Sequence, residues 1–327
     1  MLKVGLIGCG FMGTMHANCY QNIPGVSVTA FADLRREKAE ALAAGTEAVI
    51  YEDGADLIAM ADVDIIDICL PTYLHTAYAL KAMEKVPYVF IEKPVALTAE
   101  ECAALLAKQN ATGCQVQVGQ VIRFWDEYVE LKRILDSGVF GPVINANFRR
   151  ISPRPTWGWE DWLLDPVRSG GAAQDLHVHD IDFVLSLFGR PREFYSIKNT
   201  RGEKNSYVNT LMAYDDFAVT VEGTWDLPGS HPFEASFRVV CHEATLEYSG
   251  GKLLRYTDAG AEEIYIEKAQ VTGDGFEGGN ISDLGGYFNE LLYFCRQAQS
   301  RSPIAQATLA DGVSSLEFLL EEIRDKN

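Results

Sequence analysis

The stretch that decides the fold is GCGFMG, Gly8 to Gly13, which directly follows the apolar run LKVGLI at residues 2–7. Its glycines, Gly8, Gly10 and Gly13, have the spacing G-x-G-x-x-G, and a helical pattern follows them. In such a loop the first glycine permits a tight turn, the second lets the backbone approach a pyrophosphate, and the third lets helix and strand pack closely. The N-terminus of the following helix attracts the phosphates.

The next strand pattern supports a ligand-binding role for this loop more strongly than the glycine spacing alone does. VSVTAFAD, Val26 to Asp33, ends in an acid twenty residues after Gly13. A carboxylate at that position can accept hydrogen bonds from both hydroxyls of an adenosine ribose. We therefore predict a dinucleotide site. Two alternatives stay open: a glycine-rich turn in which Asp33 only caps a helix, and a methyltransferase that binds its ligand differently at the same loop.

Apolar strands and helical patterns alternate over the first third of the chain. The strand patterns are LKVGLIG, VSVTAFAD, VDIIDICL, YVFIE and CQVQVG, and segments such as REKAEALAAG and TAYALKAMEKV separate them. Continuous apolar strands joined by helices are typical of a parallel sheet that is covered on both faces. The first domain is therefore predicted to be α/β, over residues 1–121.

The pattern changes from about Phe124, and the length of the chain favours a second domain. Alternating runs between Glu193 and Tyr248 predict a largely antiparallel sheet with one face covered. Helical patterns return at residues 287–300 and 309–325. We expect residues 122–327 to form a second α/β domain for substrate binding and oligomerisation, whose C-terminal helix can pack back on the first domain.

Composition narrows the range of partners. The chain has 327 residues and a formal charge of -18, with a pI near 4.7, so its surface repels nucleic acid and anionic lipid. No apolar run reaches the roughly 18 residues that span a bilayer, and the N-terminal run is too short to indicate a signal peptide. Seven scattered cysteines without a C-x-x-C pair indicate reduced thiols. We expect a cytoplasmic protein without nucleic-acid or membrane partners.

Polar residues follow two later strand patterns, where a parallel sheet presents its ligands. Leu70, Thr72 and His75 lie in CLPTYLH, and Glu92 and Lys93 lie in EKP. Together with the glycine loop, and with VGQVIRF and SGGAAQDLHVHDID further along, these motifs stand in an order that resembles the glucose-fructose oxidoreductase and inositol dehydrogenase family, Gfo/Idh/MocA. The ordered set is specific although no single motif is, and it covers nearly the whole chain.

The resemblance implies a Rossmann domain that binds NAD(P), followed by an α/β domain with a broad open sheet. The implied catalytic residues are Lys93, Asp175 and His179. The implied cofactor-binding residues are Gly8, Gly10, Phe11, Met12, Gly13, Asp33, Leu70, Thr72, His75, Glu92 and Lys93. The implied substrate-binding residues are Lys93, Arg123, Trp157, Asp175 and His179. Two positions depart from the family's pattern: Asp126 stands where proline is usual, and His177 where a small residue is frequent.

The stretch DLHVHDID, Asp175 to Asp182, holds two of the six histidines and three aspartates. If it is an α-helix, Asp175 and Asp182 share one face with His179, and His177 points nearly opposite. A divalent ion could use that face, but we predict no metal, because no further histidine or cysteine motif completes the set. We favour His179 as the group that exchanges a proton with an alcohol. His177 and Asp180 are interpreted as residues that face water or the helix dipole.

The resemblance gives Lys93 an electrostatic role. Its ammonium group would orient the alcohol and stabilise developing alkoxide charge, while Asp175 would hold His179 or a substrate hydroxyl. The alternative is a surface lysine that follows a buried strand. The tryptophans and Arg154 in RPTWGWEDWLL, residues 154–164, predict either an aromatic wall for a sugar ring or packing in a core or interface.

These observations predict a dehydrogenase that transfers a hydride between NAD and a secondary alcohol or ketone of a sugar, an inositol-like cyclitol or a sugar derivative. NAD is favoured over NADP because the Asp33 carboxylate repels a 2′-phosphate, although Arg35 and Arg36 could soften that preference. The alternative is a catalytically silent dinucleotide-binding regulator of the same fold. A sheet with one uncovered face exposes apolar area, so we also expect a homo-oligomer, and the family resemblance implies a homodimer or homotetramer.

Overall fold

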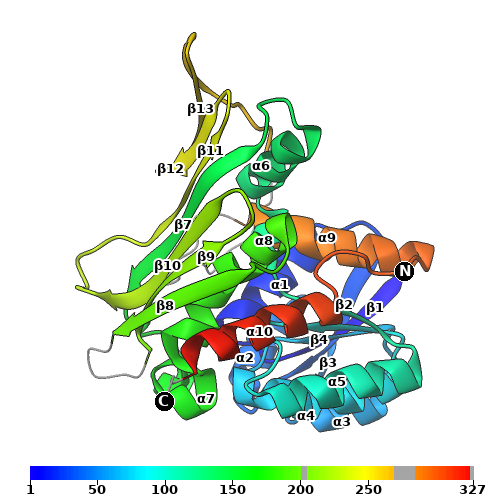
Figure 1. The fold of residues 1–327 in the computed structure, drawn as a ribbon. Coiled ribbons are helices and arrows are strands. Elements are labelled where there is room, and N and C mark those ends of the chain that lie inside the picture. Colours follow the sequence, from blue (N-terminus) through cyan, green and yellow to red (C-terminus); the bar gives the residue numbers. More distant parts are fainter. Residues whose placement is uncertain (200–204, 269–283, 325–327) are drawn as a thin grey trace. The chain divides into compact units, whose positions relative to one another are not determined.

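The computed structural model describes residues 1–199, 205–268 and 284–324, and the chain divides into two compact units (Figure 1). Unit 1 consists of Met1–Val121 and Ala269–Leu316, and unit 2 of Ile122–Lys268 and Glu317–Asn327. The second domain expected from the sequence includes both C-terminal helices. In the structure α9 (Gly285–Ser300) and residues 309–316 of α10 (Leu309–Ile323) belong to unit 1.

Unit 1 is built on a parallel sheet of six strands in the order β3-β2-β1-β4-β5-β6. The strands are β1 (Leu2–Ile7), β2 (Val26–Ala32), β3 (Val49–Tyr51), β4 (Ile65–Ile68), β5 (Tyr88–Ile91) and β6 (Gln115–Val118). The predicted parallel α/β unit is confirmed. The strand order reverses between β1 and β4, and sheets of this kind bind ligands at that point, outside the carboxyl ends of the strands.

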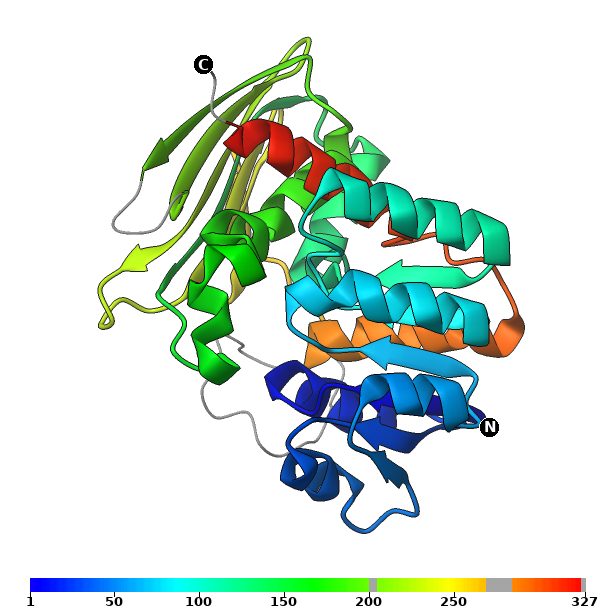
Figure 2. The ribbon, with the colours of Figure 1, turned by 90° about the horizontal axis from the view of Figure 1, so that it is seen from below.

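Helices cover both faces of this sheet, α3, α4 and α5 on one and α1 and α9 on the other (Figure 1); Figure 2 views the unit from the side of α3 to α5. The helices before α9 are α1 (Phe11–Gln21), α2 (Arg36–Ala43), α3 (Gly54–Met60), α4 (Thr72–Lys85) and α5 (Ala99–Thr112). Local signals set their ends. At α5, for example, Thr98 and Glu101 form a reciprocal capping box, and Gly113 ends the helix in the left-handed region.

Unit 2 contains a mixed sheet of eight strands in the order β14-β13-β12-β11-β7-β10-β9-β8. The strands are β7 (Val143–Pro153), β8 (Glu193–Asn199), β9 (Tyr207–Ala213), β10 (Ala218–Leu227), β11 (Glu234–Cys241), β12 (Thr245–Ser249), β13 (Lys252–Thr257) and β14 (Gly260–Glu263). Only the β7–β10 pair is parallel among these described strands. The expected large, mostly antiparallel sheet is confirmed; residues 200–204 of the predicted stretch lie outside the described residues.

Apart from the end of α10, the helical segments of unit 2 precede β8. They are η1 (Val121–Phe124), α6 (Asp126–Ser137), η2 (Trp159–Leu164), α7 (Pro166–Ser169), the π-helical turn η3 (Ala173–His177) and α8 (Val178–Phe188). The buried ring of Tyr128 on α6 packs edge-to-face on Phe183 of α8 and Phe237 of β11, with centroids 4.9 and 5.1 Å away. This aromatic core fixes the helices on one face of the sheet. Asp126 begins α6, as expected for a helix start.

All seven cysteines are free and six of them are buried, in agreement with the reduced thiols that their spacing predicts. Within the described residues, no helix is both long enough and apolar enough to cross a bilayer.

Candidate cofactor and catalytic sites

The glycine loop joins β1 to α1 in a conformation that requires glycine twice. Gly8 has φ +94°, and a Cβ there would lie 2.5 Å from the carbonyl oxygen of Cys69. A Cβ on Gly13 would lie 1.9 Å from the carbonyl oxygen of Gly8. A Cβ on Gly10 would meet only Arg35 Nη2, at 3.8 Å, so the backbone is open to a ligand there. Phe11 and Met12 begin α1, whose first turn carries no acidic residue to repel phosphate.

Asp33 follows β2 and is hydrogen-bonded to the glycine loop. Its Oδ2 accepts from the backbone N–H of Cys9 (2.8 Å), and its Oδ1 accepts from the backbone N–H of Arg35 (2.8 Å). The Arg35 guanidinium also pairs with Asp33, with Nε 3.3 Å from Oδ1. Arg36 instead pairs with Glu40 and, at 3.5 Å, with Glu52. Of the two arginines, Arg35 is therefore the one that stands beside the predicted ribose site.

His75 lies inside unit 1 and connects the loops that follow β4 and β5. Its Nδ1 is 2.8 Å from the carbonyl oxygen of Pro94, and its Nε2 is 2.7 Å from that of Leu70. The side chain is 1% exposed, and burial lowers the pKa of this imidazole. Because backbone carbonyls lie against both ring nitrogens, His75 links these two loops, and its place in a cofactor site stays a prediction. Thr72, at the start of α4, is also buried.

Lys93 directly follows the buried Glu92 and is itself partly exposed. Glu92 Oε2 accepts a hydrogen bond from the backbone N–H of Lys93 (3.0 Å), and Glu92 Oε1 is 3.1 Å from His16 Nε2. His16 in turn contacts Asp67 of β4. Sequence reasoning missed His16 and Asp67, although a charged residue within an apolar strand such as IIDI was a signal for a buried ionic contact.

The histidine-rich stretch of unit 2 does not form one regular α-helix. Ala173–His177 is a π-helical turn, η3, and α8 continues from it. Gly170 precedes this turn with φ +77°, and a Cβ there would lie 2.1 Å from Gln174 Oε1. The wider turn alters the spacing of side chains that an α-helix would place on one face, and such turns are frequent at functional sites. Asp175 is partly exposed and His179 is 8% exposed.

Two of the three aspartates in this stretch form ion pairs with arginines. Asp180 accepts from Arg150 of β7, with Nε 2.7 Å from Oδ2 and Nη2 3.3 Å from Oδ1. Asp182 accepts from Arg123 of η1 at 2.6 and 2.7 Å. Asp180 is fully buried, so the interpretation that it faces water is wrong, although it lies in the first turn of α8, as the helix-dipole interpretation expects. Both pairs anchor α8, and the predicted contact of Arg123 with substrate stays a prediction.

His177 is also fully buried, so the interpretation of this residue as solvated is wrong too. Its Nε2 is 3.3 Å from Glu322 Oε1 in the last turn of α10. Its ring packs on Gly223 of β10, where a Cβ would lie 2.4 Å from Nδ1. The histidine in place of a small residue is thus accommodated by a glycine opposite. The helical period suggested which way His177 points but not that α10 and β10 would cover it.

The predicted aromatic wall lies around η2. Trp157 is 39% exposed and Trp159 is 36% exposed, so neither ring is a core residue. Arg154 of the same segment pairs with Asp226 of β10, with Nη2 3.1 Å from Oδ1. Exposed aromatic rings are available to a ligand or partner, and the contact of Trp157 with substrate stays a prediction.

Unit 1 thus brings together a glycine loop at the reversal of a parallel sheet, an acid after β2 and a lysine after β5, which together define a dinucleotide-binding Rossmann unit. Unit 2 supplies Asp175 and His179. Residues 2–120 match the family model described as an oxidoreductase family with an NAD-binding Rossmann fold, and residues 128–247 match that of the GFO/IDH/MocA C-terminal domain. The chain belongs to the Gfo/Idh/MocA family, which confirms the resemblance, and unit 1 holds its NAD-binding Rossmann domain.

Curated relatives include an inositol 2-dehydrogenase of Salmonella typhimurium, 30% identical over 68% of this chain and 64% of the relative. Another, from Klebsiella pneumoniae, is 37% identical over 63% of this chain and 60% of the relative. The chain therefore spans less than two thirds of the length of these relatives. A solved levoglucosan dehydrogenase in complex with NADH and levoglucosan has a TM-score of 0.84 at 20% identity, over 98% of this chain and 97% of that one. This last likeness shows the fold.

Proposed function

We propose that the protein is an NAD-dependent dehydrogenase that acts on a secondary alcohol or ketone of a sugar, a cyclitol or a sugar derivative. The observation that carries the proposal is the series of Gly8, Asp33 and Lys93 after β1, β2 and β5 of one parallel sheet. Membership of an oxidoreductase family supports the reaction class. Relatives named inositol 2-dehydrogenase and a neighbour in complex with levoglucosan support a polyol or sugar as the substrate class.

The residues of unit 1 fit a bound dinucleotide. The open backbone at Gly10 and the acid-free N-terminus of α1 suit a pyrophosphate, and Asp33, already fixed by the Cys9 amide, suits a ribose. Leu70 and Thr72, after β4, would lie toward the nicotinamide end. When bound, NAD supplies the acceptor for a hydride from the alcohol carbon. The remaining chemistry is assigned to side chains of this chain.

In our proposal His179 takes the hydroxyl proton of the alcohol during oxidation and returns it during reduction. Lys93 orients the same oxygen and stabilises its developing negative charge. Asp175 holds the substrate or His179, and Trp157 and Arg123 contribute to binding the polyol. The ion pair between Arg123 and Asp182 fixes the helix from which His179 projects.

A panel of cyclitols and aldoses, assayed for NADH formation, tests the proposal. We expect turnover with at least one member and none without NAD. The alternative, a dinucleotide-binding regulator without turnover, predicts that NAD binds while no member of the panel reacts. Binding and turnover are therefore measured on the same preparation.

The preference for NAD is expected to depend on Asp33. In Asp33→Ser the carboxylate that repels a 2′-phosphate is gone and Arg35 loses its partner, so NADP should gain about tenfold or more in affinity relative to NAD, about 1.4 kcal/mol. Adding Arg35→Ala should cancel this gain, whereas adding Arg36→Ala should not, because Arg36 pairs with Glu40. Titration of both cofactors measures the ratio. A wild type that already binds NADP more tightly would contradict the assignment.

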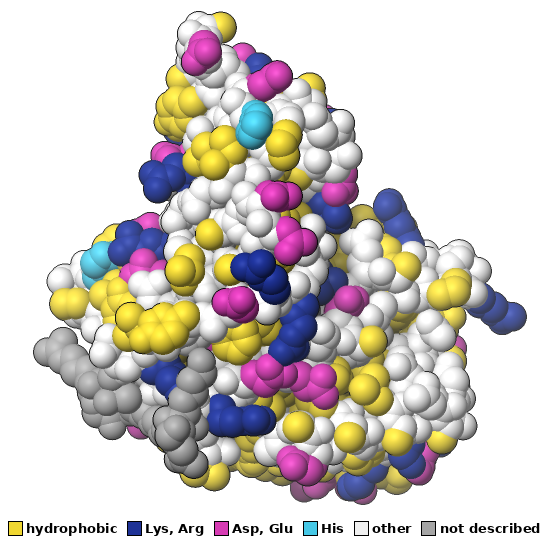
Figure 3. All heavy atoms as spheres, in the orientation of Figure 1, with side chains coloured by type: hydrophobic (Ala, Val, Ile, Leu, Met, Phe, Trp, Pro, Cys, Tyr) yellow, Lys and Arg dark blue, Asp and Glu magenta, His cyan; other side chains and the backbone are white. Residues whose placement is uncertain are grey.

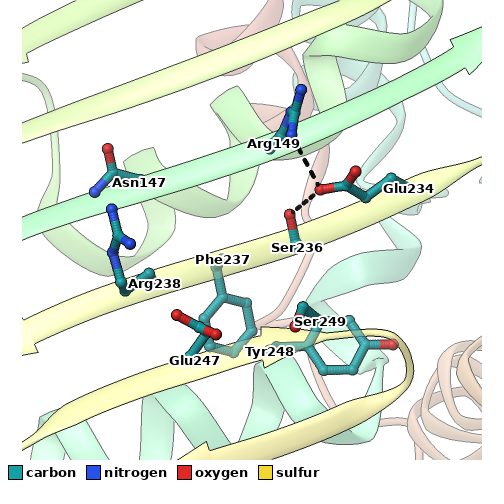
Figure 4. A pocket seen from close by; sticks show the side chains of 9 residues that line it. All are labelled: Asn147, Arg149, Glu234, Ser236, Phe237, Arg238, Glu247, Tyr248 and Ser249. Carbon is teal, nitrogen blue, oxygen red and sulfur yellow. Dashed lines mark hydrogen bonds and ion pairs between the residues drawn. The ribbon is translucent and has the colours of Figure 1, made fainter.

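One face of the unit 2 sheet stays partly exposed. On β8, Tyr195 and Ile197 are 62% and 53% exposed, and on β9 Leu211 is 48% exposed and lies opposite Tyr195. Figure 3 shows hydrophobic side chains among charged ones over this part of the chain. On β7, β11 and β12 the sheet carries a shallow pocket of about 230 Å³, where Arg149 and Ser236 are directed at Glu234 (Figure 4). This face is more mixed in polarity than the sequence indicated.

We expect this face to join copies of the chain, because alternating apolar and charged groups on a broad sheet suit a self-complementary interface. Light scattering should give a mass that is a multiple of 36.2 kDa. Ile197→Lys with Leu211→Lys should lower that mass. Val167→Lys, at an apolar residue of α7 that is 81% exposed, serves as the matched control and should leave it unchanged. A wild type that scatters only as a 36.2 kDa species at micromolar concentration would contradict the proposal.

A further inference from the structure

A buried chain of ionisable side chains in unit 1 ends at the backbone of Lys93. His16, on α1, has Nδ1 2.8 Å from Asp67 Oδ2 and Nε2 3.1 Å from Glu92 Oε1. The other oxygen of Glu92 accepts from the Lys93 N–H at 3.0 Å. The His16 and Asp67 side chains are 0% exposed and that of Glu92 is 6% exposed. The chain of contacts therefore runs from β4 through α1 to the residue after β5 without passing through solvent.

The contacts of His16 favour a doubly protonated imidazole. A neutral histidine has one N–H, so one of its two nitrogens would direct a lone pair at a carboxylate oxygen. An imidazolium donates to Asp67 and Glu92 at once and offsets one of their two charges. Burial alone would lower the pKa of His16, but the attraction of the Asp67 carboxylate raises it well above its ordinary value.

Further contacts hold Asp67 and the imidazole in place. The Tyr20 hydroxyl donates to Asp67 Oδ2 at 2.9 Å. The Cys69 Sγ lies 3.5 Å from Asp67 Oδ1 and 3.2 Å from His16 Nδ1. The ring of Phe90, on β5, packs edge-on against the imidazole with centroids 5.3 Å apart. With partners on α1, β4 and β5, His16 has a single orientation, and so does the Glu92 carboxylate that it contacts.

A metal ion is a poorer interpretation of the same cluster. His16, Asp67 and Cys69 have ligand atoms within 4.8 Å of one another. However, His16 Nδ1 and Asp67 Oδ2 are at hydrogen-bonding distance, 2.8 Å, whereas two ligands of a tetrahedral zinc ion lie about 3.3 Å apart.

We propose that His16 is a positioning residue: as a cation between Asp67 and Glu92 it fixes the Glu92 carboxylate, and Glu92 fixes the backbone of Lys93. The inference rests on the proposed function only in taking Lys93 as a residue that acts on the alcohol. Because α1 begins at the glycine loop, His16 also ties the helix of the cofactor site to the loop that carries the lysine. Small displacements of such groups cost large factors in rate.

The test compares His16→Gln and Glu92→Gln with Tyr78→Phe, which removes a hydrogen bond to Asp53 in the same unit but none in the network around His16. We expect each of the first two to lower kcat about 10- to 100-fold, and His16→Gln, which changes no predicted cofactor-binding residue, to keep the NAD dissociation constant within about twofold of wild type. The double variant should lose no more than the larger single loss, because the two residues act as a unit. Tyr78→Phe should stay within about twofold in kcat.

Two spectroscopic measurements test the inference without turnover. In ¹⁵N spectra of the imidazoles, we expect His16 to be protonated on both nitrogens at pH 8. After reductive methylation with ¹³C, the Lys93 signal, assigned by its loss in Lys93→Arg, should move in His16→Gln and not in Tyr78→Phe. A neutral His16, or a Lys93 signal that His16→Gln leaves in place, overturns the inference. If the wild type turns over no substrate, the proposed function fails and these two measurements still decide the role of His16.

Discussion

We expect the replacement of His179 with alanine to lower kcat by about 10²- to 10⁴-fold in a protein that stays folded and still binds NAD. A loss in kcat of this size is typical when a proton-transfer group is removed, because hydride transfer from the alcohol would then lack a positioned base. The fold should survive because α8 is held from either side by Arg150 and Arg123, through Asp180 and Asp182. NAD binding should survive because the cofactor residues of our proposal lie in unit 1.

The measurement is kcat and KM with the best substrate of the panel, together with NAD titration. His242→Ala, at an exposed position of unit 2, is the control and should match wild type. If Lys93 and His179 act together, Lys93→Met also lowers kcat, and the double variant loses less than the product of the single losses. A His179→Ala enzyme near the wild-type rate would contradict the assignment, and so would inactivation of the wild type by a chelator that added metal reverses.

A substitution of His177 tests whether a histidine of the same stretch serves the reaction or the packing of unit 2. We expect His177→Ala to lose far less kcat than His179→Ala, because His177 contacts Glu322 and Gly223 inside unit 2. Its loss leaves Glu322 buried with one partner fewer, so the effect is on stability.

The parts of the fold that the sequence predicted are those with local causes. Apolar runs identified the strands of the first sheet, and the glycine spacing identified the loop because turn geometry excludes a side chain at Gly8 and Gly13. The π-helical turn was missed, since AQDLH carries no local mark of an extra residue; the crowding between Gly170 and Gln174 appears only in three dimensions.

The parts that were missed depend on distant partners. Arg123 lies 59 residues from Asp182, and Asp67 lies 51 residues from His16. A charged residue faces water unless it has a partner, so without knowledge of Arg150 the natural interpretation of Asp180 was solvation. That inference failed because the buried guanidinium and carboxylate come together from a strand and a helix. The sequence alone could propose Lys93 and His179 through a family resemblance, but not the ion pairs that hold their surroundings.

The second large effect that we expect is a loss of stability when the ion pair between Arg150 and Asp180 is broken. Both side chains are almost fully buried, 3% and 0% exposed, so Asp180→Ala leaves a guanidinium in the core without its partner. We expect a loss of about 3–5 kcal/mol in the free energy of unfolding. Asp136→Ala, which breaks the exposed pair with Lys132 on α6, is the matched control and should cost less than about 1 kcal/mol. Urea unfolding followed by a unit 2 tryptophan measures both, and equal midpoints for the two variants would contradict the expectation.

A further variant tests whether the ion pair between Arg150 and Asp180 serves the stability of the protein or the placement of α8. In Arg150→Met with Asp180→Leu both charges are gone, and apolar replacements of similar volume often equal or exceed a buried ion pair in stability. The methionine can keep part of the packing of Arg150 against the rings of Trp125 and Phe233. We therefore expect this double variant to regain most of the stability that Asp180→Ala loses. It lacks the two directional hydrogen bonds that set the rotation of α8, and so the position of His179. A stable double variant with reduced kcat would assign the pair to the placement of α8, whereas a stable variant with wild-type kcat would show that packing alone places this helix.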